Sequence, residues 1–266
     1  AADIQELLRK NKPARPQAEL FKLKQQMVDE LLHIRKCGLK ELISDCIGAM
    51  LFGPSGLFAF YDLFMPEDLD SPPTQPEYYP PHRYRMRTMK LFMDKEGYTN
   101  ALLDLKKPPK VIDDVHALLG YIDRIISEEP DREVLRNSVL VNMAYDWIER
   151  TLPDAIIFAK GRAKEAIYVS TNIGGEVTEL LDRIAIGITP NEINRHPNLT
   201  TVDWRSTLIA GWIYKIHGRS VPYDTKKIMS DGDIDRLQRL CMRAVEYIMF
   251  EKSFGKRLRM PEETTA

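Results

Sequence analysis

Cysteine is scarce in this sequence, and the few that occur exclude a disulfide scaffold and a cysteine zinc site. The 266 residues include Cys37, Cys46 and Cys241, an odd number at spacings that match no zinc motif. A chain of this length buries a substantial core without disulfides, so we expect three reduced, buried thiols. The first 17 residues are charged and lack the apolar core of a signal peptide. Together these features predict a cytoplasmic protein.

An excess of one charge is also lacking. The sequence has 38 Lys and Arg against 39 Asp and Glu, which leaves a formal net charge of −1. Proteins built mainly to bind nucleic acid or an anionic membrane carry a basic excess, so neither is an expected partner. The uncharged run over residues 46–61 is shorter than the ~20 residues of a membrane span, and Gly53-Pro54-Ser55-Gly56 interrupts it. The expected partner is another protein, and the oligomeric state stays open.

Common catalytic motifs are missing as well. None of the five histidines lies in an H-E-x-x-H helix, and the chain has no G-x-S-x-G elbow, P-loop or G-x-G-x-x-G turn. These absences exclude the usual zinc hydrolases, serine hydrolases and nucleotide-binding folds. They favour a protein that is not an enzyme and that holds no cofactor.

Helical periodicity, in contrast, is strong. Apolar residues recur at steps of three and four, which predicts an all-α, irregular multi-helix bundle. Gly38 is expected to break or bend one helix and Pro153 to end another. Residues 155–170 are β-leaning and fit either a helix or one small β-hairpin. The expected helices cover about residues 17–36, 39–53, 57–64, 82–96, 111–127, 129–152, 175–187, 201–218 and a last long helix from 230 onward.

Proline is concentrated in one segment. Residues 66–81 hold six of the seventeen prolines and no apolar period, which predicts an extended loop. This loop is either a surface connector or a polyproline ligand for another protein. Pro108-Pro109 marks a second break. The chain is therefore expected to form an N-terminal helical half, residues 1–107, and a C-terminal helical half, residues 108–266, or one domain containing both.

One pattern has the spacing of a metal site. Glu41-Leu42-Ile43-Ser44-Asp45 places two carboxylates at i and i+4 on a helix that is otherwise apolar. This pattern resembles the E-x-x-x-D helix of gluzincin-type zinc metallopeptidases. Gly53-Pro54 and the segment from Pro81 to Arg85 also look like the stretches that follow this helix in bacterial relatives.

The resemblance implies that Glu41 is the third zinc ligand and that Asp45 supports the histidine ligands. It covers about residues 39–90, and no H-E-x-x-H precedes Glu41. The implied protein is therefore a degenerate or partial metallopeptidase-like hydrolase domain, with zinc as its cofactor. The alternative is that Glu41 and Asp45 pair with Lys40, Arg35 or a distant arginine.

Two further groups are candidate binding residues. Arg83, Arg85 and Arg87 are interleaved with an aromatic residue, as on phosphate-binding surfaces, although steps of about 200° fan them around a helix axis. Trp204 and Trp212 share one face of a predicted helix, where they serve as core residues or as protein contacts.

The sequence thus supports three hypotheses. The first is a non-catalytic helical protein-interaction or regulatory module, with the proline-rich loop and the two tryptophans as contacts. The second is the metallopeptidase-like hydrolase domain. The third is a nucleic-acid-binding helical protein that uses the three arginines.

Overall fold

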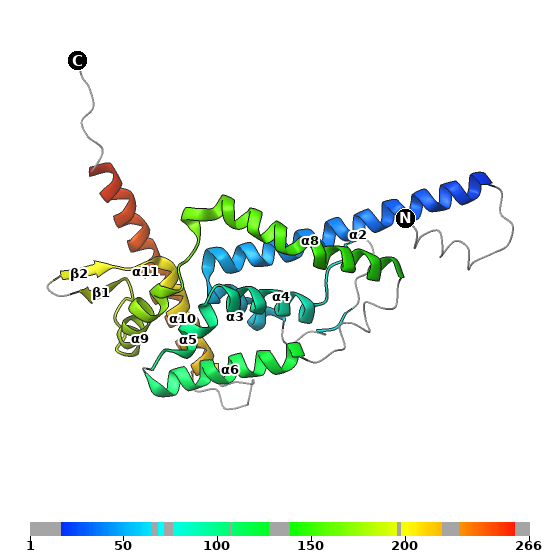
Figure 1. Cartoon of the computed structure of the whole chain (residues 1–266). Coiled ribbons are helices and arrows are strands. Elements are labelled where there is room, and N and C mark those ends of the chain that lie inside the picture. The colour runs from blue at the N-terminus through cyan, green and yellow to red at the C-terminus, as the bar shows by residue number, and fades with distance from the viewer. Residues whose placement is uncertain are drawn as a thin grey trace, which may run out of the picture.

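The predicted all-α fold is confirmed. The computed structural model describes residues 17–64, 69–71, 77–106, 108–127, 139–195, 198–219 and 229–258. Half of the proline-rich loop, residues 66–68 and 72–76, lies outside these ranges. The α-helices in Figure 1 are α2 (Gln17–Phe52), α3 (Pro54–Phe64), α4 (His82–Lys95), α5 (Tyr98–Leu103), α6 (Pro109–Ser127), α8 (Val139–Ala163), α9 (Thr178–Ala185), α10 (Trp204–Arg219) and α11 (Asp231–Leu258).

The first long helix, α2, continues through Gly38, so of the two predicted outcomes, a break or a bend, the break does not occur. α2 and α8 lie side by side (Figure 1). A Cβ atom at position 38 would lie only 2.8 Å from Cδ1 of Ile148 in α8. Glycine costs a helix about 1 kcal/mol, and the close packing that it permits offsets this cost. A second core cluster, which includes Ile34, Leu42 and Tyr145, fills the α2–α8 interface.

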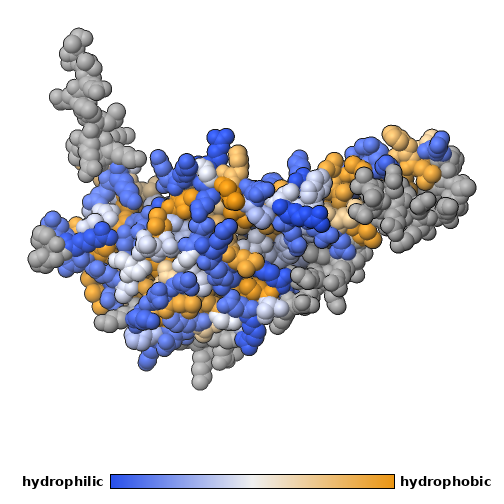
Figure 2. All heavy atoms as spheres, in the orientation of Figure 1, coloured by the Kyte–Doolittle hydropathy of each residue, from blue (hydrophilic) through white to orange (hydrophobic). Residues whose placement is uncertain are grey.

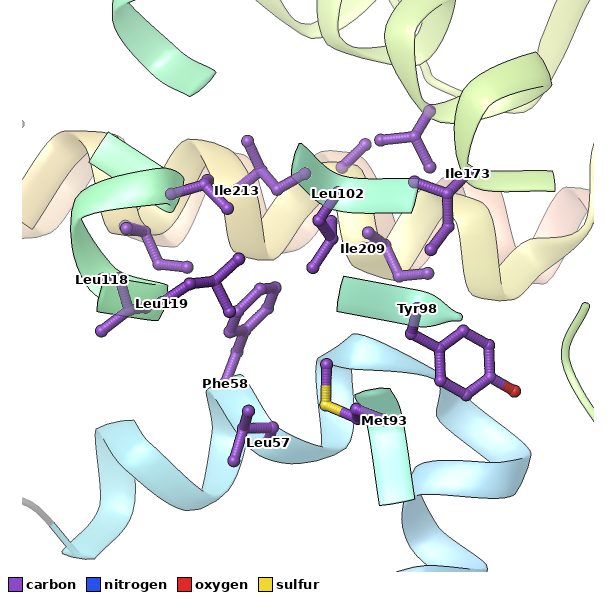
Figure 3. Close-up of a cluster of buried hydrophobic side chains, with 14 of the residues drawn as sticks. Leu57, Phe58, Met93, Tyr98, Leu102, Leu118, Leu119, Ile173, Ile209 and Ile213 are labelled. Atoms are coloured by element: carbon purple, nitrogen blue, oxygen red, sulfur yellow. The ribbon is translucent and has the colours of Figure 1, made fainter. Parts of the chain in front are cut away.

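The main core lies where α3, α4, α5, α6 and α10 meet. Figure 3 shows Phe58 of α3 beside Leu119 of α6, with Ile213 of α10 on the far side of the cluster. α6 supplies a buried stripe at helical spacing, within the helix predicted over residues 111–127. Its buried residues are Val111, Ile112, Val115, Leu118, Leu119, Ile122, Ile125 and Ile126. Residues on both sides of Pro108-Pro109 contribute to this one core.

The segment near residues 155–170 is helical at its start, so the small hairpin does not lie there. α8 continues through Pro153 to Ala163, and a 3₁₀ turn, η1 (Lys164–Ala166), follows. The predicted helix end at Pro153 is also wrong. Proline removes one donor to the carbonyl four residues earlier, and Glu149 at that position is exposed, so solvent can replace the bond.

The small hairpin lies further along the chain. Strands β1 (Glu192–Arg195) and β2 (Asn198–Thr201) pair antiparallel, with Glu192 opposite Thr201. A π-helical turn, η2 (Ile173–Val177), precedes α9. Residue 201, where a helix is expected to begin, belongs instead to β2, and α10 begins at Trp204.

The last helix, α11, begins at Asp231, next to the predicted start at residue 230. The backbone N–H of Asp233 donates to Oγ of Ser230 at 3.2 Å, and the backbone N–H of Ser230 donates to Oδ2 of Asp233 at 3.1 Å. This reciprocal pair is a capping box. From that start α11 packs against α10 and then extends away from the body (Figure 1).

Within the described ranges, no helix is both long enough and apolar enough to cross a membrane. On the face in Figure 2, hydrophobic and hydrophilic residues are interspersed over the body of the molecule.

Candidate functional site

The two acids of the E-x-x-x-D pattern lie on the face of α2 that meets α4, and both are close to Arg85. Nε and Nη2 of Arg85 donate to the two carboxylate oxygens of Asp45, each at 2.8 Å. Nη2 of Arg85 also lies 3.4 Å from Oε2 of Glu41. The Arg85 and Asp45 side chains are 13% and 10% exposed, so water screens the pair little. Bidentate pairs of this kind are among the strong hydrogen-bonded contacts in proteins.

The surroundings of Arg85 stabilise its charge. Burial alone would lower the pKa of the guanidinium, but the hydrogen bonds and charge of Asp45, with the charge of Glu41, raise it. The guanidinium also lies over the Phe60 ring, 5.1 Å from its centroid. Burial and the Asp45 charge raise the pKa of the neighbouring Cys46 thiol to about 12, so this thiol stays protonated at neutral pH.

This arrangement matches the interpretation that Glu41 and Asp45 pair with a distant arginine. Both Asp45 oxygens already accept from Arg85, so a zinc ion at this site would have to displace the guanidinium. The His82 ring stacks on Phe64, with ring centroids 4.2 Å apart. Among the described residues, no three His, Cys, Asp or Glu side chains are grouped so that they could hold a metal ion.

Arg83 and Arg87 lie on another face of α4 and contact the C-terminal end of α6. Arg83 donates to the Ile125 carbonyl, and Nε of Arg87 donates to the Ile126 carbonyl at 2.8 Å. Carbonyls in the last turn of a helix lack intrahelical donors, and the helix dipole favours cations there. Arg83 also forms a bidentate pair with Asp70, with both distances 2.8 Å. The three arginines therefore contact different elements and do not form one patch.

Arg87 also lines a groove of about 420 Å³ between α4 and α8. Leu91, Leu152 and Ile156 give this groove apolar walls. The Tyr84 hydroxyl donates to Oε1 of Glu149 at 3.3 Å, which links the two helices beside the groove.

Trp204 and Trp212, the two candidate contact residues, are both partly buried on α10, and each packs against the main core. Trp204 meets Phe52 at the end of α2 edge-to-face, with ring centroids 5.7 Å apart. The Trp212 ring lies under Nζ of Lys215, 4.3 Å from the ring centroid. The two tryptophans therefore have different surroundings. Trp204 packs α10 against the end of α2, whereas Trp212 borders an open groove.

This groove lies between α10 and α11 and has a volume of about 360 Å³. Lys215 and Gln238 are its charged and polar side chains, and Nζ of Lys215 donates to Oδ2 of Asp62 at 2.8 Å. The other walls are apolar apart from backbone groups. The lining residues are Leu208, Gly211, Trp212 and Lys215 from α10, and Ile234, Leu237, Gln238, Cys241 and Met242 from α11.

Close approach of the two helices forms the floor of the groove. A Cβ atom at Gly211 would lie 2.7 Å from Sγ of Cys241, so position 211 accepts no larger residue without a shift. Burial raises the pKa of the Cys241 thiol to about 12, so the floor carries no charge at neutral pH. The groove thus offers an apolar slot with a cation at its rim.

A buried polar network lies at the N-terminal end of α10, and the sequence patterns did not reveal it. Oγ of Ser206 donates to Oε2 of Glu176 at 2.6 Å, and the backbone N–H of Asp203 donates to the same oxygen at 3.1 Å. Because the Ser206 proton goes to Glu176, the Tyr168 hydroxyl donates to Ser206, at 2.9 Å. Ser206 is 0% exposed, which leaves no access for a substrate. The network anchors η2 to α10. Gly174 and Gly175 precede Glu176 in the same π-helical turn.

No family model, curated protein or solved structure matches this chain. The α10–α11 groove is the candidate functional site on its geometry alone.

Proposed function

We propose that the chain is a cytoplasmic, non-catalytic helical module that binds another protein through the α10–α11 groove, without a metal or cofactor. One observation supports this proposal most directly. The groove is apolar, has a volume of about 360 Å³ and is bordered by the partly buried Trp212. Tryptophan is enriched among the residues that dominate binding energy in protein interfaces.

The shape and chemistry of the groove favour an amphipathic helix as the ligand. An apolar slot between two helices accepts side chains spaced by one helical turn. Burial of one Leu or Phe side chain there would contribute about 1.5–3 kcal/mol. Met242 at the rim is 53% exposed, and methionine adapts to differently shaped ligands.

The test compares two methionines of the same helix. Met242 lines the groove, whereas Met249 lies outside it and is exposed to nearly the same degree, 53% against 52%. Proteins captured by the wild-type chain from cells of its source are identified, purified and titrated against Met242→Glu and Met249→Glu. We expect Met242→Glu to weaken binding at least tenfold and Met249→Glu to leave it unchanged. Equal binding by the two variants would refute the groove as the contact site.

A further inference from the structure

α11 is much longer than the helix that supports it. It has 28 residues and α10 has 16, so at 1.5 Å per residue α11 extends about 18 Å further. Up to residue 254, the last one in α11 whose side chain is described, Ile248 is the final buried residue of the helix. Past Ile248, Glu251 accepts a hydrogen bond from the Thr201 hydroxyl of β2, and the C-terminal part of α11 then projects from the body (Figure 1). A short helix without packing is only marginally stable in water. The outer face of α11 is therefore a surface that lacks a covering element among the described residues.

Six exposed side chains follow each other along this face, and we refer to them as the outer stripe. Steps of three or four residues place them on one side of the helix. The outer stripe consists of Arg236, Arg239, Arg243, Tyr247, Phe250 and Phe254. Its aromatic residues are 44%, 66% and 53% exposed in that order, and the Phe250 and Phe254 rings stack with centroids 6.0 Å apart. Exposed aromatic clusters of this kind mark interaction sites.

The outer stripe has a cationic half and an aromatic half. Arg239 and Arg243 form no ion pair with any residue that the structure describes, so their charges face solvent. Arginine over an aromatic ring is a favourable contact. An occupant that suits both halves must therefore bring aromatic rings or anions to the arginines, and cations or apolar groups to the rings.

A second copy of the same helix meets this requirement when it runs antiparallel. Reversal of the sequence about Val245 places Arg243 opposite Tyr247 and Arg236 opposite Phe254. The remaining arginine, Arg239, falls within one position of Phe250 in that alignment. A two-fold axis uses each such contact twice, so three pairings along one helix become six in the dimer.

Other arrangements are less well matched. A parallel pair would place each arginine opposite its own copy, where like charges repel. A helix that lies on a lipid surface has apolar residues on one side of its axis and cations on the other. In the outer stripe the two kinds are instead separated along the axis. A polyanion such as nucleic acid would satisfy the arginines but require no antiparallel match.

We propose that the chain forms a two-fold symmetric homodimer in which the outer stripes of two α11 helices pack antiparallel, each arginine over an aromatic ring of the other copy. Residue pairs 243 and 247 form the centre of the interface. The α10–α11 groove is on a different side of α11, since no residue of the outer stripe lines it. Dimerisation is therefore independent of the function proposed for the groove.

The test is a swap of one central pair, measured by sedimentation equilibrium of the full chain. We expect wild type to be dimeric at micromolar concentrations, and Tyr247→Arg to raise the dissociation constant at least tenfold, because arginine then faces Arg243 of the other copy. The double variant Arg243→Tyr with Tyr247→Arg restores one arginine–aromatic pair on each side of the axis, and we expect it to regain the dimer. Met249→Glu, outside the outer stripe, serves as the matched control and is expected to remain dimeric.

Each other outcome contradicts the proposal. A wild-type chain that is monomeric at 100-fold higher concentration, or that dimerises only when an oligonucleotide or anionic vesicles are added, overturns self-association. A dimer that tolerates Tyr247→Arg uses another surface. A swap variant that stays monomeric rules out the antiparallel register, with circular dichroism confirming that α11 remains helical.

Discussion

Arg85 and Asp45 are 40 residues apart in the sequence, yet they form a bidentate pair that joins α4 to α2. Both side chains are largely buried, and Glu41 adds a second carboxylate 3.4 Å from the same guanidinium. In such a site, loss of one partner leaves the other charge buried without compensation. The pair is therefore a sensitive point of the fold.

Substitution Arg85→Leu is expected to lower the free energy of unfolding by about 3–5 kcal/mol. The physical reason is that Asp45, only 10% exposed, would lose its counter-ion. Urea denaturation followed by circular dichroism measures this change. The double variant Arg85→Leu with Asp45→Leu removes both charges and should recover most of the loss. A double variant as unstable as the single one would show that shape, not charge, sets the cost.

Zinc binding is expected to be absent at Glu41 and Asp45 as long as Arg85 is in place. Elemental analysis of the purified chain after dialysis against zinc should give far less than one ion per chain, and Glu41→Gln should not change the result. Stoichiometric zinc that disappears in Glu41→Gln would instead support the metallopeptidase-like hypothesis.

Alanine at Gly53 is expected to destabilise the fold by roughly 2–4 kcal/mol. Gly53 has a φ of +59°, and a Cβ atom there would lie 2.7 Å from the Tyr168 ring. Gly187 provides a matched control, because its φ is +73° and nothing lies within 4 Å of its Cβ position. Gly187→Ala is expected to lower the free energy of unfolding by about 1 kcal/mol, which is the cost of a left-handed backbone conformation alone. Equal melting-temperature shifts in the two variants would contradict a steric role for Tyr168.

Acid sensitivity is expected from Asp203. Burial alone would raise its pKa, but the hydrogen bonds and charge of Arg205 lower it below the ordinary value of 3.8. A pKa lower in the folded than in the unfolded state means that the carboxylate stabilises the fold above about pH 4. This contribution is lost as the pH falls through the folded pKa. We expect Asp203→Asn to be less stable than wild type by about 1–2 kcal/mol at neutral pH.

The same comparison at acid pH provides the check. The stability difference between wild type and Asp203→Asn should shrink towards zero as the pH falls through the lowered pKa of folded Asp203, because wild type then carries a protonated Asp203 as well. Denaturant titrations at several pH values measure the difference. A difference that does not depend on pH would assign the effect to the amide rather than to the lost charge.

Local patterns in the sequence identified the elements whose cause is local. The capping box of Ser230 and Asp233 and the buried stripe of α6 depend on residues three or four positions apart. The predicted break at Gly38 and the predicted helix end at Pro153 do not occur, because the effect of each residue depends on partners outside its own helix. Ile148 approaches Gly38 across the α2–α8 interface, and solvent access at Glu149 makes Pro153 tolerable.

The candidate sites were likewise predictable only where they depend on residues close together in the sequence. Spacing placed Glu41 and Asp45 on one helix face, but the choice between a metal and an arginine depended on Arg85, which the fold brings from another helix. Trp212 was found by residue type, whereas the groove beside it requires the packing of α11 on α10. The Glu176 network had no sequence signal, since its members come from three separate segments.

Tyr168 joins three segments that are far apart in the sequence. Its backbone N–H donates to Met50, its carbonyl accepts from Tyr98 at 2.5 Å, and its hydroxyl meets Ser206 at 2.9 Å. The last two contacts close loops of 70 and 38 residues, and closing long loops costs chain entropy before any contact compensates for it. Most contacts in a helical protein are local and form quickly. The contacts of the Tyr168 ring are therefore expected to form late in folding, and burial of this ring would mark the last step rather than the first.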